Sequence, residues 1–270
     1  MKVFYAVAVG LLSLTLGQAQ AGNGPRRVPD EAYTQQLIRV LTGLQKNPWL
    51  GWESGTEVVV RYWVESNATG TPLGRAQPEI VFKVVEADKL FITTQVYKGK
   101  LIRHEFLVKD QGGLDAAWPR VMDPTTTDPT TTDMEIDGFT LSCLLSELTM
   151  REFPGGTTVS KQWTLTSHPS IVLRTEVVGS NGWRVTSAQV IKKIGEREFP
   201  CVEIKKWMRF YSKGPNDAMT TQYLCPDVPG HLVEEIQEFF KVKKEQRSSA
   251  PFHIGHLKVV ELKLQKPTRS

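Results

Sequence analysis

The chain has 270 residues, with 33 Lys and Arg against 29 Asp and Glu and a formal net charge of +4. This length suits one large all-β domain or two small ones, with enough residues to bury a sizeable core. Because the charge is small and basic residues are mixed with acidic ones, the composition favours neither nucleic acid nor an anionic membrane surface as a partner.

The amino terminus has the pattern of a secretory signal peptide. Lys2 precedes an apolar run from Val3 to Leu16, and Ala19-Gln20-Ala21 is the small-x-small pattern of a cleavage site. We expect residues 1–21 to be removed and the remaining chain to be exported, periplasmic or extracellular. The apolar run is too short to span a bilayer, so no membrane span is predicted.

An amphipathic helix is predicted over residues 31–45. Its apolar residues recur at helical spacing, namely Tyr33, Leu37, Val40, Leu41 and Leu44. Asp30 is a suitable N-cap, and the helix is expected to end before Pro48. We expect the apolar stripe to pack on a sheet.

From Gly51 onward the chain has the pattern of strands and turns. Alternating apolar residues predict a strand from Val58 to Val64, and further strands follow over residues 79–86, 89–97 and 100–108. Tight turns between these segments indicate a meander. Residues 111–133 are rich in glycine, proline and threonine, and we expect them to form a solvent-exposed loop.

A hairpin-sized unit occurs twice, over residues 134–176 and 192–236, and we interpret it as an internal duplication within a single β-rich domain of residues 22–270. Matched residues keep their order along the two copies; they include Ile136 and Ile194, Cys143 and Cys201, Gly156 and Gly214, and Trp163 and Tyr223. Chance matching between strand-rich segments is the alternative.

The two copies also decide the secondary structure of ambiguous runs. The leucines between Leu141 and Leu148 fit a helix in isolation, but the equivalent residues around Val202 and Ile204 alternate with charged ones, as in a half-buried strand. The run from Leu232 to Phe240 is interpreted as a strand by the same comparison. Asn181-Gly182 predicts a two-residue hairpin turn, and a final strand is predicted near Leu257 and Val259.

These elements predict a mainly β fold. We expect an antiparallel meander of about ten to twelve strands that forms a twisted sheet or an open half-barrel, with one N-terminal amphipathic helix. This estimate follows from the spacing of strand and turn signals.

The cysteines are Cys143, Cys201 and Cys225. Export permits a disulfide, and the odd count leaves one thiol over. Cys201 and Cys225 lie on segments expected to be adjacent, so they are the predicted disulfide. Buried free thiols are the alternative, because Cys201 matches Cys143 in the other copy whereas Cys225 matches Leu165.

No motif for catalysis stands out. Nucleotide-binding glycine loops, zincin histidine pairs and nucleophile elbows are absent from the sequence. His253 and His256 lie close together and His231 could join them, but a metal site needs three or four converging ligands. Cys143 and Cys201 sit in apolar strand patterns rather than beside a base. We therefore predict no catalytic residue, no cofactor and no metal, and enzyme is the weaker class.

Tryptophan is frequent, with 7 residues. Buried, these side chains form core; exposed together on one sheet face, they stack on sugars or line an apolar groove. We expect core for most of them.

Two resemblances add to this interpretation. Pro48-Trp49, Gly55 and Val58 to Val60, followed by Gly195, Phe199, Cys201 and the turn Val228-Pro229-Gly230, resemble motifs of a loosely defined set of uncharacterised exported bacterial β-rich proteins, with which no activity is associated. The signal peptide and the helix-then-meander order are similar to the open β-barrel of periplasmic lipoprotein carriers, which hold a lipid in a concave sheet.

The sequence thus predicts an exported protein that binds rather than transforms its ligand. Our leading hypothesis is an apolar or lipid-like small molecule held on the concave sheet face, and the alternative is a non-enzymatic structural or protein-interaction module of the cell envelope. A hydrophobic small molecule and an envelope protein are the expected partners.

Overall fold

The computed structural model describes residues 27–66, 73, 78–97, 100–111, 125–126, 128–152, 156–178, 180–210, 216–243, 246–248 and 250–265. The predicted signal peptide, residues 1–21, lies outside these ranges. Among the described residues, no helix is long and apolar enough to cross a membrane.

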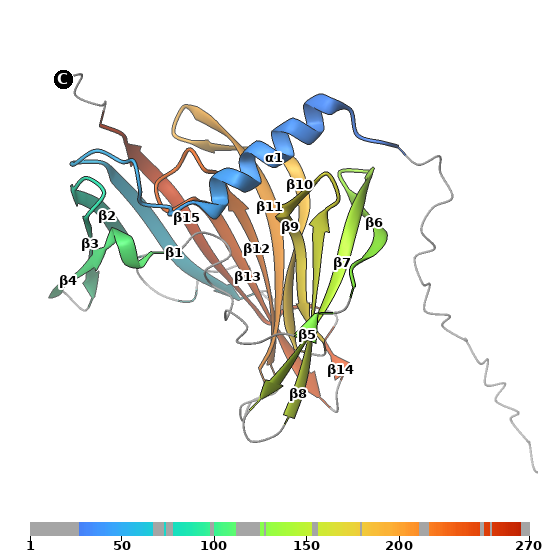
Figure 1. Ribbon diagram of the computed structural model, residues 1–270. Helices are drawn as coiled ribbons and strands as arrows, with labels where there is room; N and C mark the ends of the chain where they lie inside the picture. The colour runs from blue at the N-terminus through green and yellow to red at the C-terminus, as the bar shows by residue number, and fades with distance from the viewer. Residues whose placement is uncertain are drawn as a thin grey trace, which may run out of the picture.

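The strands form one antiparallel sheet that curves into an open half-barrel (Figure 1). The N-terminal part contains β1 (Glu57–Ser66), β2 (Glu79–Glu86), β3 (Leu90–Tyr97) and β4 (Lys100–Leu107), followed by a short 3-10 helix, η1 (Val108–Asp110). The central part contains β5 (Thr125–Thr126), β6 (Thr130–Ile136), β7 (Phe139–Glu152), β8 (Gly156–Leu165) and β9 (His168–Val177). The C-terminal part contains β10 (Asn181–Ile194), β11 (Arg197–Phe210), β12 (Asn216–Leu224), β13 (Leu232–Lys243), β14 (Gln246–Arg247) and β15 (His253–Lys263).

The spatial order is β4-β3-β2-β1-β15-β13-β12-β11-β10-β9-β8-β7-β5, with β6 also paired to β7 and β14 to β13. Most neighbours are consecutive in the chain, as expected for a meander. The long-range pairing joins β1 to β15, from Glu57 opposite Lys263 to Ser66 opposite His253. The predicted mainly β, antiparallel, open fold with one helix is therefore confirmed.

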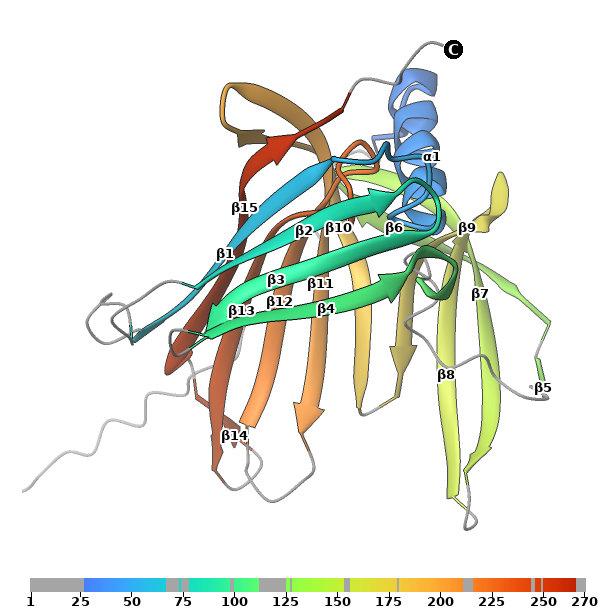
Figure 2. The ribbon, with the colours of Figure 1, turned by 90° about the vertical axis from the view of Figure 1, so that its left-hand side faces the viewer.

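The helix α1 (Glu31–Gln45) has the predicted bounds and lies inside the curve at one end of the half-barrel (Figure 2). The carboxylate of Asp30 caps it by accepting a hydrogen bond from the backbone N–H of Tyr33 at 2.7 Å. All five apolar residues of the predicted stripe are buried. They share one core with side chains of β7, β9, β10 and β11, which include Leu141, Leu173, Trp183, Val185 and Ile204.

The two copies of the predicted duplication adopt the same arrangement of hairpins. Strands β6 to β9 form the first and the end of β10 to β13 the second, so both leucine- and phenylalanine-rich runs are strands, as predicted. Cys143 pairs with Leu165, and the register of Val202 with Leu224 places Cys201 opposite Cys225. Common origin of the copies stays a prediction, although matched residues occupy matched positions.

Two local predictions are wrong. Asn181-Gly182 begins β10 rather than forming the turn, which lies between Val177 and Ser180; there the N–H of Ser180 donates to the carbonyl of Val177 at 3.0 Å. The end of the predicted loop of residues 111–133 is also wrong, because its β-branched threonines form β5 and the start of β6. Residues 112–124 and 127 of that loop lie outside the described residues. With these short strands the described sheet has 15 strands rather than ten to twelve.

Two of the motifs quoted for the first resemblance meet in space. The N–H of Gly230 donates to the carbonyl of Pro48 at 2.9 Å, and a Cβ on Gly230 would lie 3.1 Å from the ring of Trp49. The segment after α1 is thereby held against the turn between β12 and β13. The resemblance itself stays a prediction.

Candidate functional site

Three basic side chains form a row across neighbouring strands of the sheet. Arg174 on β9 lies opposite Arg184 on β10, and Arg184 lies opposite Lys205 on β11. We call these residues the cation row. Side chains directly opposite on antiparallel strands share one face and lie close together, so their like charges repel one another.

The cation row lies on the outer face of the half-barrel, opposite α1. Arg184 is exposed, whereas its neighbours Trp183 and Val185 are buried in the core that contains α1. Because successive strand residues point to opposite faces, Arg184 points away from that core. The row is thus accessible from solvent.

A tryptophan flanks each side of Arg174. The guanidinium carbon of Arg174 is 4.2 Å from the ring centroid of Trp163 and 5.9 Å from that of Trp207. Its Nη2 is 2.5 Å from Oε2 of Glu176. Its Nε is buried and has no hydrogen-bond partner among the described residues. Stacking and one carboxylate therefore hold the guanidinium in place while leaving one donor unused.

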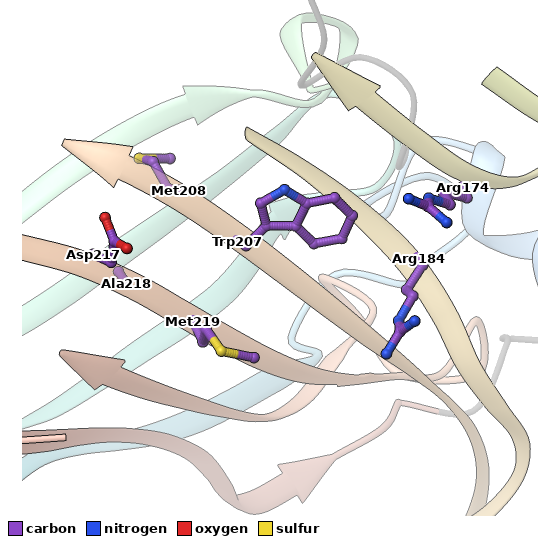
Figure 3. Close-up of a pocket in the computed structure, with 7 residues that line it drawn as sticks. All are labelled: Arg174, Arg184, Trp207, Met208, Asp217, Ala218 and Met219. Carbon is purple, nitrogen blue, oxygen red and sulfur yellow. The ribbon is translucent and has the colours of Figure 1, made fainter. Parts of the chain in front are cut away.

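Arg184 differs from Arg174 in that its side chain makes no hydrogen bond or ion pair with any residue that the structure describes. It lines a pocket of about 340 Å³ together with Arg174, Trp207 and Asp217. The remaining lining is apolar and consists of Met208, Ala218 and Met219. Figure 3 shows both guanidinium groups on one side of the Trp207 ring and the methionines on the other. The pocket therefore combines cationic and apolar surface.

Gly182 positions Trp207 within the pocket. These residues are opposite one another on β10 and β11, and a Cβ on Gly182 would lie 2.4 Å from the Trp207 ring and 2.6 Å from the carbonyl oxygen of Thr175. Only glycine leaves room for the indole to lie flat against β10. The Asn-Gly pair that suggested a turn is explained by this close contact.

Asp137 fixes the irregular part of β10 next to the row. The register of β10 shifts between Val185 and Val190, and within this bulge the N–H of Ala188 donates to Oδ2 of Asp137 at 2.8 Å. The same oxygen accepts from the hydroxyl of Tyr33 on α1 at 2.9 Å. Burial and this carboxylate raise the pKa of Tyr33, which keeps the hydroxyl protonated as a donor. Asp137 thus ties the helix to the bulge.

A second pocket, of about 650 Å³, lies on the other side of the two arginines. It is lined by Arg174, Arg184, Lys205 and acidic residues of β6 and β11, including Glu135 and Glu203. Glu203 accepts a hydrogen bond from Thr186 at 2.7 Å and lies 3.7 Å from the amine of Lys205. The charge of Lys205 is therefore partly compensated, so Arg184 is the member of the row whose side chain has no partner in the part of the chain that the structure describes.

The inner face of the sheet is polar next to the helix-covered core. Gln222 and Glu235 continue the line of Ile204 across β12 and β13, and Glu235 accepts hydrogen bonds from Gln222 and Gln237. Burial lowers the pKa of the nearby Lys206, and the charge of Glu235 opposes that shift. The predicted apolar ligand on the concave face stays untested, but these polar side chains are a poor surface for it.

The predicted disulfide partners lie opposite one another. All three cysteines are buried free thiols in the structure. The hydrogen bond between Cys201 and Cys225, together with burial, raises the pKa of Cys201. Burial, with the charge of Asp133, raises the pKa of Cys143 to about 11, which disfavours the nucleophilic thiolate. The disulfide between Cys201 and Cys225 stays a prediction.

Oxidation is expected to join Cys201 and Cys225 and leave Cys143 free. Each thiol would lose a proton and one electron to an added disulfide such as oxidised glutathione, and closing this loop would stabilise the chain by about 3 kcal/mol. Maleimide labelling after denaturation, read by mass spectrometry, should find a single reactive thiol in the oxidised protein and three in the reduced one. Three labels after oxidation would contradict the pairing.

The histidines weighed as ligands do not converge. His253 and His256 lie on β15, whereas His231 lies in the turn before β13, where burial lowers its pKa to about 4. Among the described residues, no group of three or more His, Cys, Asp or Glu side chains could hold a metal ion.

The cation row was not predicted from the sequence. Arg174, Arg184 and Lys205 lie on three consecutive strands, and the register of those strands places them side by side. Trp207 was counted among the tryptophans that either form core or line a groove, and it lines the first of these pockets. Comparison with protein-family models, curated proteins and solved structures found no match. Function must therefore be inferred from the site's own geometry.

Proposed function

We propose that this protein binds an anionic amphiphile, a hydrocarbon-bearing carboxylate or phosphate monoester, in the outer-face pocket. In this proposal Arg174 and Arg184 hold the anionic group and Trp207 and Met219 hold the hydrocarbon. This proposal differs from the expectation from the sequence in two respects: the lipid-like ligand carries an anionic head group, and it binds on the outer face rather than the concave face.

The observation that carries the proposal is the guanidinium of Arg184 in the middle of the cation row, which has no partner among the described residues. Like charges directly opposite on a sheet destabilise it by roughly 0.2–1 kcal/mol for each pair. Arg174 forms an ion pair with Glu176 and Lys205 forms one with Glu203, whereas no described carboxylate forms an ion pair with Arg184. A bound anion would remove the repulsion, and a carboxylate or phosphate matches the donor geometry of guanidinium groups.

The apolar lining supports a hydrocarbon portion for the ligand. Met219 lies opposite Trp207 on the same face of the sheet, and its flexible side chain adapts to irregular chains. The pocket volume of about 340 Å³ lies within the range of small-molecule sites. Its described lining has one carboxylate, Asp217, and no histidine, cysteine or serine, so binding is favoured over catalysis.

Arg184→Gln is expected to weaken the binding of decanoate and decyl phosphate by about 10- to 100-fold, because a hydrogen bond to a charged group contributes roughly 1.5–3 kcal/mol. Isothermal titration calorimetry below the micelle concentration measures this change. Arg197→Gln is the matched control, since Arg197 is also exposed on β11 but lies outside the pocket. It should leave the affinity unchanged.

Two further ligands separate the parts of the proposal. Decyl maltoside has the same chain without charge, and inorganic phosphate has the charge without a chain; both should bind at least tenfold more weakly than decyl phosphate. Equal affinity for decyl maltoside would contradict the role of the arginines. Equal affinity for inorganic phosphate would contradict the role of the apolar lining and show that the pocket binds a simple anion.

The second candidate is a protein-interaction module of the cell envelope. It is favoured by the exposed apolar side chains of the edge strand β4, among them Leu101 at 71% and Leu107 at 46% exposure. Such an edge invites strand pairing with another chain.

A further inference from the structure

The strand β4 is one edge of the sheet, and among the described residues it pairs only with β3. Seven of its eight residues are exposed. Three of the exposed side chains are large and apolar, namely Leu101, Phe106 and Leu107. Its other exposed side chains are polar or charged, and natural proteins protect an edge strand by pairing it, covering it or placing charges on it.

The direction of the backbone groups of β4 determines which residues another strand can reach. The N–H of Val108, just after β4, donates to the carbonyl of Lys89 at 2.9 Å, on the β3 side. Hydrogen-bonding direction alternates along a strand, so Ile102, His104 and Phe106 bond to β3. The N–H and C=O groups of the odd-numbered residues from Leu101 to Leu107 therefore point outward.

We propose that two copies of this chain form a dimer through antiparallel pairing of β4 with β4 of the second copy, about a two-fold axis at His104. In this register Leu101 lies opposite Leu107 of the second copy, and Arg103 lies opposite Glu105. Both pairs join residues whose backbone groups point outward, as hydrogen bonding requires. Ile102 then lies opposite Phe106 of the second copy, and His104 lies opposite His104 of the second copy.

This register is self-complementary in both charge and polarity. Apolar residues meet apolar residues, and each Arg103 meets an opposite charge, a favourable cross-strand pair. Within one chain Arg103 and Glu105 are already 2.8 Å apart and side by side on the strand, so both are presented on one face. Val96, which is 61% exposed and opposite Leu101 on β3, extends the apolar contact.

The neighbouring registers are disfavoured. Hydrogen bonding requires each residue whose backbone groups point outward to lie opposite another such residue. In the neighbouring allowed registers, the partner of each residue therefore shifts by two positions along the second copy. One step places Arg103 opposite Arg103 of the second copy and Leu101 opposite Glu105. The opposite step places Glu105 opposite Glu105 and Arg103 opposite Leu107. Both combine like charges with apolar–charged contacts, which specifies the symmetric register centred on His104.

A charge exchange tests the dimer. Size-exclusion chromatography with light scattering should give a molar mass of two chains for the wild type. The single variants Arg103→Glu and Glu105→Arg should each give the molar mass of one chain. The double variant Arg103→Glu with Glu105→Arg restores the opposite-charge pair and should restore the dimer. Circular dichroism checks that each variant is folded. A monomeric wild type at about 100 μM, or single variants that remain dimeric, would overturn the proposal.

Cross-linking tests the register separately. Residues facing each other in a non-hydrogen-bonded pair have Cα atoms about 4.5 Å apart, within the range of a disulfide. His104→Cys should therefore form a covalent dimer on mild oxidation, seen on a non-reducing gel, whereas Arg103→Cys should not, because Glu105 lies opposite it. Efficient cross-linking of Arg103→Cys with none of His104→Cys would overturn the register.

Discussion

Gly182→Ala is expected to destabilise the protein by about 3 kcal/mol and to remove ligand binding in the outer-face pocket. The added Cβ would lie 2.4 Å from the Trp207 ring and 2.6 Å from the backbone oxygen of Thr175. The backbone oxygen cannot move without breaking the pairing of β9 with β10, so the strands separate or the indole is displaced. Urea unfolding measures the first effect and decanoate titration the second.

Gly255→Ala is the matched control for that experiment. Gly255 also lies within a strand, β15, but its added Cβ would meet nothing closer than 3.6 Å, the distance to Cβ of Gln237. Alanine there should be neutral or stabilise the chain by roughly 0.4–1 kcal/mol through the unfolded state. Equal stability of the two variants would show that the contact between Gly182 and Trp207 is unimportant.

Asp137→Ala is expected to lower the free energy of unfolding by about 3 kcal/mol. It removes the oxygen that accepts hydrogen bonds from both Ala188 N–H and the Tyr33 hydroxyl, and an unsatisfied buried donor costs roughly 1–3 kcal/mol. Asp137 also has a φ of 54°, where alanine is strained and aspartate or asparagine is tolerated. Chemical denaturation monitored by circular dichroism measures the change.

Two variants separate the causes of that loss. Asp137→Asn keeps an acceptor oxygen and tolerates the positive φ, so it should retain most of the stability. Asp137→Gly accepts the backbone conformation but has no acceptor, so it should be nearly as unstable as the alanine variant. If the asparagine variant is as unstable as alanine, the negative charge rather than the shared acceptor is what holds α1 to the bulge.

Local patterns predicted most of the elements correctly. The stripe from Tyr33 to Leu44 and the Asp30 cap predicted α1 with its bounds, because helix formation depends on residues within one or two turns. Comparison of the two copies identified β7 and β13 as strands where periodicity was ambiguous. The turn at Asn181-Gly182 was wrong because the glycine meets a tryptophan on another strand.

The candidate site could not be predicted in the same way. Arg184 and Lys205 are unremarkable in sequence, and their proximity depends on the register of β10 with β11, which includes two shifts. The lack of a partner for the Arg184 side chain among the described residues is likewise a property of the surrounding surface. The register of such a hairpin depends on its turn, on bulges and on which face the core buries, and local propensity does not specify these.

By itself, then, the sequence determined the class of fold, the helix and the order of the meander, since these follow from periodicity and from the matched copies. Only the tertiary structure decided that β1 closes against β15, that the cationic side chains gather on the outer face, and that β4 remains an edge. The physical reason is that periodicity reports which side of a strand is buried, whereas neighbours across a sheet are chosen by the packing of residues distant in the chain.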